Sequence, residues 1–482
     1  MHNLGVFLED NMMIPAGKGH INVIAGVRAD NTYIKGSAYG FISSLSPRMN
    51  VKYSVSDKLS FRGSWGVAVK QPSFSVLFPT PTYQDISIFT STASADNTLY
   101  RAFYVQPRSI EYNPSLRWQR NRQAEAGVEA SLFGIRFSLA AFHNRTLYSY
   151  YLDTDYDRFT FNTTTTASVQ GLTIPAENRI YTIDHADGTI TVQDKTGAIP
   201  SQTIASQQRK QLITSTMARN AGFPITRQGL EWVVDFPRIE AIGTDIRMDG
   251  TYYTYKSVNT DIISSSSPGS TGSDGLPYRY IGYYYGGSNA ANGTLTRTLR
   301  NNVTLTTHIP RVRMILSVKL EASLLRYSQA LCERDGGKRG YAIADRSKLL
   351  EFDADAPIYN ADSYVVVFPD WYESFEEPGV RIPFMEKLAW AKENDHDLYD
   401  DLASLAVTSN YLYIFNEDRL SPYFSANVSV TKEIGDLASI SFYANNFLNN
   451  MGQVYSTKTG NYTSVTSYVP QFYYGLTLRL KF

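Results

Sequence analysis

Two short segments of the chain are rich in carboxylate side chains. Of all its side chains, these are the best suited to bind a metal ion. The two groups are Glu393, Asp395, His396, Asp397, Asp400 and Asp401, and, upstream, Asp353, Asp355 and Asp362. A calcium loop needs oxygen ligands at alternate positions around a sharp glycine turn, and neither group has that order. Charge runs of this kind usually form the solvated face of a helix, so we predict no metal site.

Groups that could act as nucleophiles or cradle a phosphate are sparse. The single cysteine, Cys332, excludes an internal disulfide and a cysteine-rich metal site, and we interpret it as an incidental loop thiol. The six histidines form no His-x-x-x-His pair. The glycine pairs Gly286-Gly287 and Gly336-Gly337 lack the strand-then-helix context of a phosphate loop, so they predict turns. No Ser/His/Asp set stands out either, and we predict no catalytic residues, no cofactor and no enzymatic activity.

Aromatic residues offer a different chemistry, the stacking of a ring against the face of a ligand. The run from Tyr278 to Gly287 is rich in tyrosine and glycine, a composition that fits sugars or cyclic metabolites. The candidate ligand-binding residues are Tyr280, Tyr283, Tyr284, Tyr285, Trp371 and Tyr372. The alternative, which we favour because tyrosine is common at interfaces, is that these rings form a membrane-interface girdle or pack loop on loop.

The composition narrows the class of protein. The 482 residues carry 45 basic and 45 acidic side chains, and this balance argues against a nucleic-acid partner, which would require a basic excess. Aromatic residues make up 13% of the chain, with 35 Tyr, 24 Phe and 5 Trp. Transmembrane barrels carry aromatic girdles at both membrane interfaces. No stretch approaches eighteen consecutive apolar residues, so a transmembrane helix is not predicted.

At the end of the chain, apolar and polar side chains alternate with period two, as they must in a membrane-spanning strand. One face holds Phe472, Tyr474, Leu476, Leu478, Leu480 and Phe482, and the other holds mostly polar residues such as Thr477 and Arg479. The strand is about eleven residues long, which suits a tilted crossing of a bilayer, whereas a strand in a soluble sheet usually has about five or six. The same alternation recurs at 58–70, 135–139, 312–324 and 424–431.

Connections between the predicted strands alternate strictly between short and long. The short ones lie at 15–19, 56–57, 133–134, 237–241, 308–311 and 434–436, and the long ones at about 31–43, 70–118, 149–225, 257–293, 328–419 and 448–469. Outer-membrane barrels have short periplasmic turns and long extracellular loops. The pattern therefore predicts an all-β transmembrane antiparallel barrel with bacterial outer-membrane lipid around it. A soluble β-rich adhesin is an alternative, and it would have shorter strands.

Thirteen strands are predicted, at 3–13, 20–30, 44–55, 58–69, 119–131, 134–148, 226–235, 242–256, 294–308, 311–327, 420–434, 437–447 and 470–482. Bacterial single-chain barrels nearly always have an even number, so we expect the chain to begin mid-barrel. A start without the features of a secretory signal agrees with that expectation. Within 328–419 we also predict one helix that begins at Pro383 and covers the barrel mouth or contacts a partner. Its apolar stripe is Met385, Leu388, Ala389, Leu398, Leu402 and Leu405.

Several short sequence segments resemble those of the TonB-dependent outer-membrane receptors, particularly receptors of the Bacteroidetes type. They are AGVRAD at 25–30, SPR at 46–48, LSFRGSWG at 59–66, KQPS at 70–73, NPSL at 113–116, EAGVE at 125–129, QGLE at 228–231 and YANNFLN at 443–449, with the terminal Phe482. They span nearly the whole chain in family order. The resemblance implies that residues 1–482 are about the last thirteen strands of a 22-stranded barrel, without the N-terminal plug domain.

The resemblance also implies a function. Members of this family take up a scarce or bulky nutrient, such as a siderophore, cobalamin, glycan or peptide, across the outer membrane of Gram-negative bacteria. Energy arrives from the TonB complex through the plug, and in glycan-importing members a surface lipoprotein closes over the barrel. Phe482 would be the signal read by the barrel-assembly machinery. A passive porin-like channel and a barrel-type outer-membrane enzyme are the alternative functions.

Overall fold

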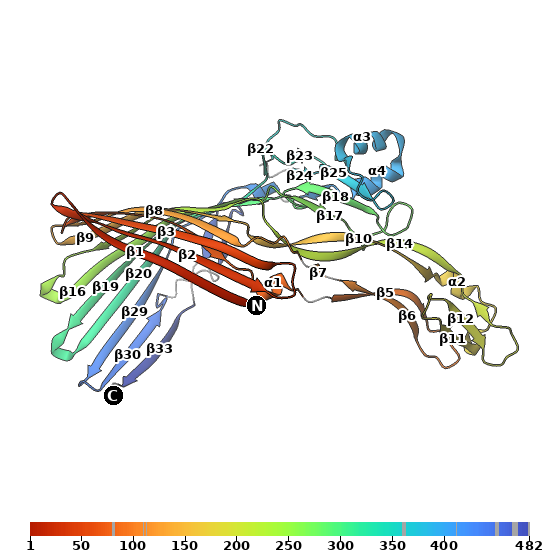
Figure 1. Ribbon diagram of the computed structural model, residues 1–482, viewed down its shortest axis with the longest axis horizontal. Helices are drawn as coiled ribbons and strands as arrows, with labels where there is room; N and C mark the ends of the chain where they lie inside the picture. The colour runs from red at the N-terminus through yellow and green to blue at the C-terminus, as the bar shows by residue number, and fades with distance from the viewer. Residues whose placement is uncertain are drawn as a thin grey trace.

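The computed structural model describes residues 1–79, 82–108, 110–111, 113–358, 363–410, 412–448, 453–464 and 471–480. Within these ranges no helix is both long and apolar enough to cross a membrane. One large antiparallel sheet dominates the fold, and the remaining elements lie in its connections (Figure 1).

The sheet contains thirteen long strands, each hydrogen-bonded to the next of them along the chain. They are β1 (His2–Ala16), β2 (Gly19–Ile34), β3 (Gly40–Ser56), β4 (Leu59–Lys70), β8 (Gln119–Leu132), β9 (Ile135–Leu147), β15 (Ile225–Asp235), β16 (Thr244–Val258), β19 (Gly293–Ile309), β20 (Met314–Leu331), β29 (Tyr423–Ile434), β30 (Ala438–Asn445) and β33 (Tyr473–Leu480). The predicted antiparallel barrel strands are confirmed in number and order, and most of them in position. The long connection predicted at about 31–43 is wrong, because β2 and β3 extend into it and leave only residues 35–39 between them. Among the described residues, β1 pairs only with β2 and β33 only with β30, so these two strands are the edges of a curved sheet (Figure 1).

The register places polar side chains on one face of the sheet and apolar side chains on the other. Lys52 of β3 pairs with Arg62 of β4, and Ser60 of β4 pairs with Glu129 of β8, all on the face that we call the polar face. The opposite, apolar face carries Trp65, which is 50% exposed. A large exposed apolar surface marks contact with a membrane or another protein. The period-two alternation read from the sequence is therefore present in the folded sheet.

The long connections contain secondary structure of their own and are not irregular. Their strands are β5 (Thr82–Ser91), β6 (Tyr100–Arg108), β7 (Ile110–Glu111), β10 (Tyr150–Thr164), β11 (Arg179–Ile183), β12 (Ile190–Asp194), β13 (Gln202–Thr203), β14 (Ser206–Asn220), β17 (Ile262–Ser265), β18 (Tyr280–Tyr285), β21 (Glu333–Arg334), β22 (Gly337–Lys338), β23 (Tyr341–Ile343), β24 (Tyr364–Val367), β25 (Trp371–Ser374), β26 (Ile382–Pro383), β27 (Val407–Ser409), β28 (Asp418–Leu420), β31 (Gln453–Ser456) and β32 (Asn461–Ser464). Strands β17, β18, β25 and β26 form a four-stranded sheet, which we call the loop sheet. Strands β10 and β14 form a long hairpin that extends away from the barrel sheet (Figure 1).

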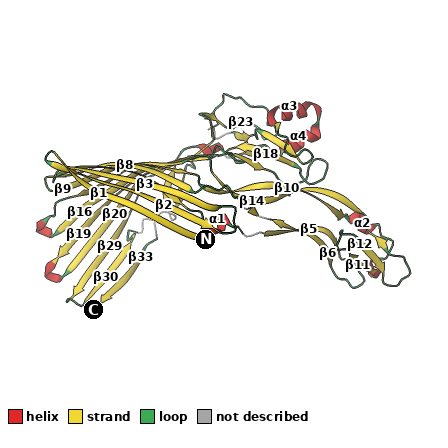
Figure 2. Cartoon of the chain, in the orientation of Figure 1, coloured by secondary structure: helices red, strands yellow, loops and turns green. Residues whose placement is uncertain are grey.

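Helices are few and lie outside the barrel sheet, in its turns and connections (Figure 2). They are α1 (Phe74–Leu77), α2 (Thr166–Gln170), α3 (Phe384–Asn394) and α4 (His396–Ala403), with 3₁₀ turns η1 (Ala176–Asn178), η2 (Glu240–Ile242), η3 (Pro310–Val312) and η4 (Leu412–Phe415).

The single helix predicted after Pro383 is wrong, because two helices occupy that segment. Asp395 has an extended backbone between α3 and α4, and its side chain accepts a hydrogen bond from the Leu398 backbone N–H at 3.1 Å. This N-cap starts a new helix and turns its direction. Leu388 and Leu402 are fully buried as predicted, but Ala389 is exposed to solvent and does not belong to the apolar stripe.

A glycine in β16 makes room for a tryptophan on the apolar face. Trp232 of β15 lies opposite Gly250, and its indole N–H donates to Asn301 Oδ1 of β19 at 3.0 Å. A Cβ at Gly250 would lie 2.3 Å from the Trp232 ring. We expect Gly250→Ala to displace the ring, to leave the Asn301 amide unsatisfied, and to destabilise the barrel by about 1–3 kcal/mol.

The measurement is the urea midpoint of the chain in detergent micelles. The matched control is Gly63→Ala on the same face, where the nearest atom to an added Cβ is 3.8 Å away. Equal midpoints for the two variants would contradict the role given to the Trp232 ring.

Candidate functional site

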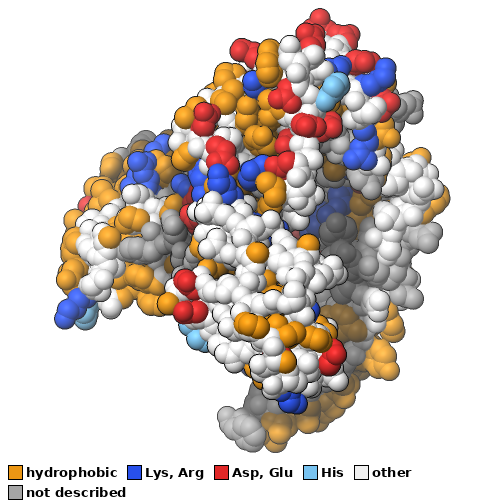
Figure 3. All heavy atoms as spheres, turned by 90° about the vertical axis from the view of Figure 1, so that its right-hand side faces the viewer, with side chains coloured by type: hydrophobic (Ala, Val, Ile, Leu, Met, Phe, Trp, Pro, Cys, Tyr) orange, Lys and Arg blue, Asp and Glu red, His pale blue; other side chains and the backbone are white. Residues whose placement is uncertain are grey.

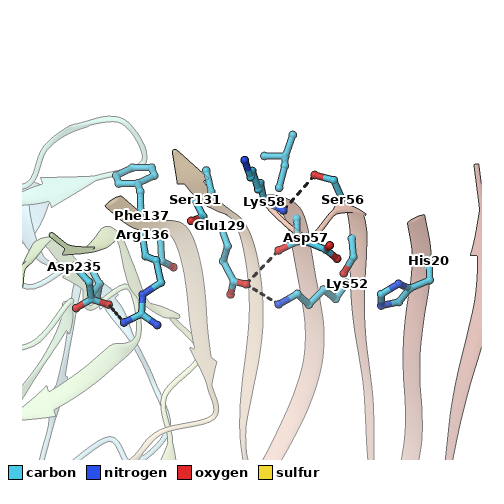
Figure 4. A pocket seen from close by; sticks show the side chains of 16 residues that line it. His20, Lys52, Ser56, Asp57, Lys58, Glu129, Ser131, Arg136, Phe137 and Asp235 are labelled. Carbon is cyan, nitrogen blue, oxygen red and sulfur yellow. Dashed lines mark hydrogen bonds and ion pairs between the residues drawn. The ribbon is translucent and has the colours of Figure 1, made fainter. Parts of the chain in front are cut away.

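Ion pairs cross from strand to strand on the polar face near the short turns. Lys52 Nζ lies 2.6 Å from Glu129 Oε2, and Ser60 Oγ donates to the same carboxylate at 3.2 Å. Arg62 extends the pairing, with its guanidinium 3.1 Å from Glu125 and 3.9 Å from Glu129. Figure 4 shows Lys52 of β3 and Glu129 of β8 pointing toward each other across β4, the strand between them. Charged groups at this density need water or polar protein around them, so this face is the wet one.

The same row of charges continues across β9, β15 and β16. Asp235 lies 3.6 Å from Arg136 and 3.8 Å from Arg247. A cavity of about 380 Å³ lies over this row, lined among others by His20, Lys52, Asp57, Glu129, Arg136 and Asp235 (Figure 4). Because carboxylates alternate with cations, the surface carries hydrogen-bonding groups of both kinds and little net charge.

Polar contacts extend to the far side of the sheet. Asn302 of β19 donates to Asp249 of β16 at 2.8 Å, and Asn427 of β29 donates to Glu321 of β20 at 2.9 Å. Glu321 also pairs with Lys319 at 2.6 Å. Polar contacts thus follow this face from β3 to β29, as expected for the wall of an aqueous lumen.

Three of the tyrosines near the loop sheet belong to its core. Tyr278 and Tyr284 are 2% exposed, and their hydroxyls donate to the backbone oxygens of Asp401 and Leu405 at 2.5 and 2.6 Å. Tyr372 is also buried, and its burial raises its pKa to about 12. The rings of Tyr278 and Tyr372 pack with Leu388 and its neighbours on α3 and α4, which is the loop-on-loop arrangement given above as the alternative to ligand binding.

The other candidates retain partial exposure. The Arg381 guanidinium lies over the Tyr283 ring at 4.1 Å, and the Arg334 guanidinium lies over the Tyr285 ring at 4.7 Å. Cation–π contacts of this kind occupy one face of each ring. Tyr280 and Trp371 are half-buried at opposite ends of the β18–β25 pairing, where Tyr280 lies opposite Ser374 and Trp371 lies opposite Tyr283. Phe482 lies outside the described residues.

A buried carboxylate that sequence analysis did not identify joins the β10–β14 hairpin to the loop sheet; we call these two elements, together with α3 and α4, the loop assembly. Glu373 of β25 is 5% exposed and accepts hydrogen bonds from Arg158 of β10, from the Tyr283 hydroxyl at 2.8 Å and from the Gly379 backbone N–H at 2.9 Å. Burial alone would raise the pKa of Glu373, but the three donors outweigh it and hold that pKa below its usual value.

Apolar packing supports this ion pair and joins the β10–β14 hairpin to the loop sheet. Leu212 of β14 is fully buried against Ile281 of β18 and against Phe375. Arg158 and Glu373 are 215 residues apart in the sequence. No local sequence pattern predicts an ion pair between residues so far apart, so sequence analysis could not identify it.

The acidic stretches lie at the surface of the loop assembly. Figure 3 shows acidic side chains gathered at the top of the view, where α3 and α4 lie. Asp401 differs, because it is buried and accepts a hydrogen bond from the Ser273 backbone N–H at 2.7 Å. In the described part of the chain no cluster of three or more histidine, cysteine or acidic residues could hold a metal ion. Asp362 lies outside the described residues.

Cys332 lies in a long connection, between β20 and β21, and its thiol is buried. It is fully buried with Ile358, Val365 and Phe415 in a small core among the long connections. Burial raises the pKa of the thiol and keeps it protonated. The cysteine behaves as a small apolar core residue.

Solved structures resemble the chain only distantly. A variant of the ferric enterobactin receptor from Pseudomonas aeruginosa is 13% identical, with a TM-score of 0.44, and the match covers 99% of this chain and 44% of that one. The outer-membrane transporter YddB from Escherichia coli is 8% identical, with a TM-score of 0.16, and the match covers 100% of this chain and 75% of that one. The chain therefore spans less than half of the length of the first of these proteins. No curated protein matches it.

The model of one protein family matches almost the entire sequence. The family is described as the β-barrel of TonB-dependent receptor-like proteins, and the match runs over residues 1–480. It agrees with the thirteen long antiparallel strands of the sheet and with its separate apolar and polar faces. The chain belongs to the TonB-dependent receptor β-barrel family.

Proposed function

We propose that this chain is the barrel portion of an outer-membrane receptor that takes up a scarce or bulky nutrient with energy supplied through TonB. One observation carries the proposal: the sheet has a charged polar face, and a large folded assembly of long connections lies at one end of it. A polar wall suits a path for a ligand, and folded long connections suit its capture. The long-connection end faces the medium, and the short turns face the periplasm.

Within this proposal the partly exposed rings of the loop assembly contact the ligand. Trp371 lies directly opposite Tyr283, on the face of the loop sheet that also carries Tyr285, whereas Tyr280 lies on the other face beside Tyr372. The buried Tyr284 and Tyr372 support them from the core and hold their positions. The candidate ligands for these rings are siderophores, cobalamin, glycans and peptides. By the family resemblance, a surface lipoprotein is a further partner, and it would contact α3 and α4.

A passive porin-like channel is the second candidate, favoured by the wet polar face alone. The two candidates differ in their need for energy. In cells that express the complete protein, we expect accumulation of the cognate nutrient to fall at least about tenfold when a protonophore collapses the proton gradient or when TonB is deleted. The measurement is uptake of labelled ferric siderophores, cobalamin, oligosaccharides and peptides in strains with and without the gene. Gene-dependent uptake that persists without the gradient would establish the passive channel instead.

A further inference from the structure

A large cavity lies on the polar face near the long-connection end, away from the row of charges in Figure 4. Its volume is about 1040 Å³, and β1 to β4 form its wall. Trp118, which directly precedes β8, closes one side. A second cavity, of about 400 Å³, lies against Trp118 as well. Trp118 therefore separates the two spaces and contacts both.

The indole of Trp118 carries an unused hydrogen-bond donor. The side chain is 7% exposed, and its Nε1 is buried without a hydrogen-bond partner among the described residues. Buried tryptophan N–H groups usually find an acceptor, because leaving the donor unpaired costs free energy. A cavity beside such a donor can supply that acceptor from a bound molecule.

The charged groups that line the larger cavity are already paired with each other. Arg28 Nε and Nη2 both donate to the Asp30 carboxylate at 2.8–2.9 Å, and Arg48 pairs with Glu9. Two bound guanidinium–carboxylate pairs leave no net charge to attract an ion. They still present hydrogen-bonding edges to a neutral molecule.

The rest of the lining supplies amides, hydroxyls and one apolar ring. The polar groups are Asn3, Gln71, Gln123, Thr32, Ser44 and Ser46. Phe7 lies across from Arg28 on the polar face, and its ring is 74% exposed. A bare aromatic ring among amides and hydroxyls is suited to a ligand that has both an apolar face and several hydrogen-bonding groups.

We propose that this cavity binds an uncharged ligand with an apolar face and many hydroxyl groups, such as a neutral oligosaccharide, and that Trp118 donates a hydrogen bond to it. The inference rests on the proposed uptake function and assigns a ligand class to one part of the wall. The smaller cavity is lined by Arg117 and Arg120, so an anionic ligand is the competing class and must be measured beside the neutral one.

The test is calorimetric titration of the chain in a zwitterionic detergent without a sugar headgroup, because a glycosidic detergent would compete. Maltohexaose and xylohexaose are the neutral probes, and hexagalacturonate is the anionic probe of matched size. We expect saturable binding of at least one neutral probe and none of the anionic probe. Trp118→Phe keeps a ring and removes the N–H donor, so it should weaken binding by about 2- to 10-fold.

Trp65→Phe is the matched control, since Trp65 lies on the apolar face and should leave binding unchanged. Binding of the anionic probe, binding of no probe, or equal affinity in wild type and Trp118→Phe would each overturn the inference. These outcomes leave TonB-dependent accumulation in cells untouched, so failure here is distinguishable from failure of the proposed function.

Discussion

Replacing Glu373 with leucine is expected to release the β10–β14 hairpin from the loop sheet. The change leaves the Arg158 guanidinium, whose side chain is 23% exposed, without its carboxylate partner. Removing one member of a buried ion pair typically costs about 3–5 kcal/mol, because the remaining charge stays desolvated. We expect faster amide hydrogen exchange in 150–164 and 206–220, while exchange in the barrel strands stays unchanged.

The matched control is Glu376→Gln, which removes the exposed ion pair with Lys210. In that pair Lys210 Nζ lies 2.6 Å from Glu376 Oε2, and the two side chains are 38% and 52% exposed. Glu376 also lies 3.6 Å from the Arg279 guanidinium, and the variant removes this second contact too. Exposed pairs contribute about 0–1 kcal/mol, so exchange in the hairpin should barely change. Equal exchange in the wild type and the Glu373→Leu variant would show that Leu212 and its apolar neighbours hold the hairpin without the ion pair.

Acid should reproduce the effect of the leucine variant. The pKa of Glu373 is lowered in the folded protein from the ordinary value of 4.5. The stability that its ionised form contributes is therefore complete above about pH 4.5 and is lost as the pH falls through the folded pKa. Hairpin exchange should rise in that acid range in the wild type and stay independent of it in the Glu373→Leu variant.

An arginine at Leu320 is expected to prevent assembly of the barrel in the membrane. Leu320 lies on the apolar face of β20, opposite Val303 of β19 and Ala426 of β29. A charged side chain on the lipid face of a barrel costs about 2–4 kcal/mol near the middle of the bilayer. The measurement is the amount of folded chain in the outer-membrane fraction, judged by resistance to unfolding in cold detergent.

Ser317→Arg is the control, because Ser317 lies three positions away in β20 but on the polar face, between Thr306 and Ser429. An arginine there meets water and other polar groups, and folded protein should reach near wild-type amounts. If the two variants assemble equally well, the assignment of the apolar face to lipid fails.

The sequence alone determined the barrel. Period-two alternation is a local property, since each residue's type and its immediate neighbours decide which face it occupies. Stretches such as 58–70 and 312–324 therefore predicted both the strands and their faces, and the structure places Trp65 and Leu320 on the apolar face. The short turns followed for the same reason, because they join neighbouring strands directly.

The tertiary structure alone decided the interior of the long connections. Tyr278 and Tyr372 look like any exposed loop tyrosines in the sequence, but contacts with α3 and α4 bury them. The helix break at Asp395 depends on a single capping hydrogen bond inside an otherwise helical pattern.

The pairing of Arg158 with Glu373 and the unsatisfied Trp118 donor also come from segments that are distant along the chain. Each of these features depends on which polar groups become neighbours in the folded chain. The packing of whole strands and helices decides this. Sequence periodicity carries no information about it, because a local pattern fixes the face of a residue and not its partner. The barrel wall could thus be inferred from the sequence, whereas the geometry of the sites built on it required the fold.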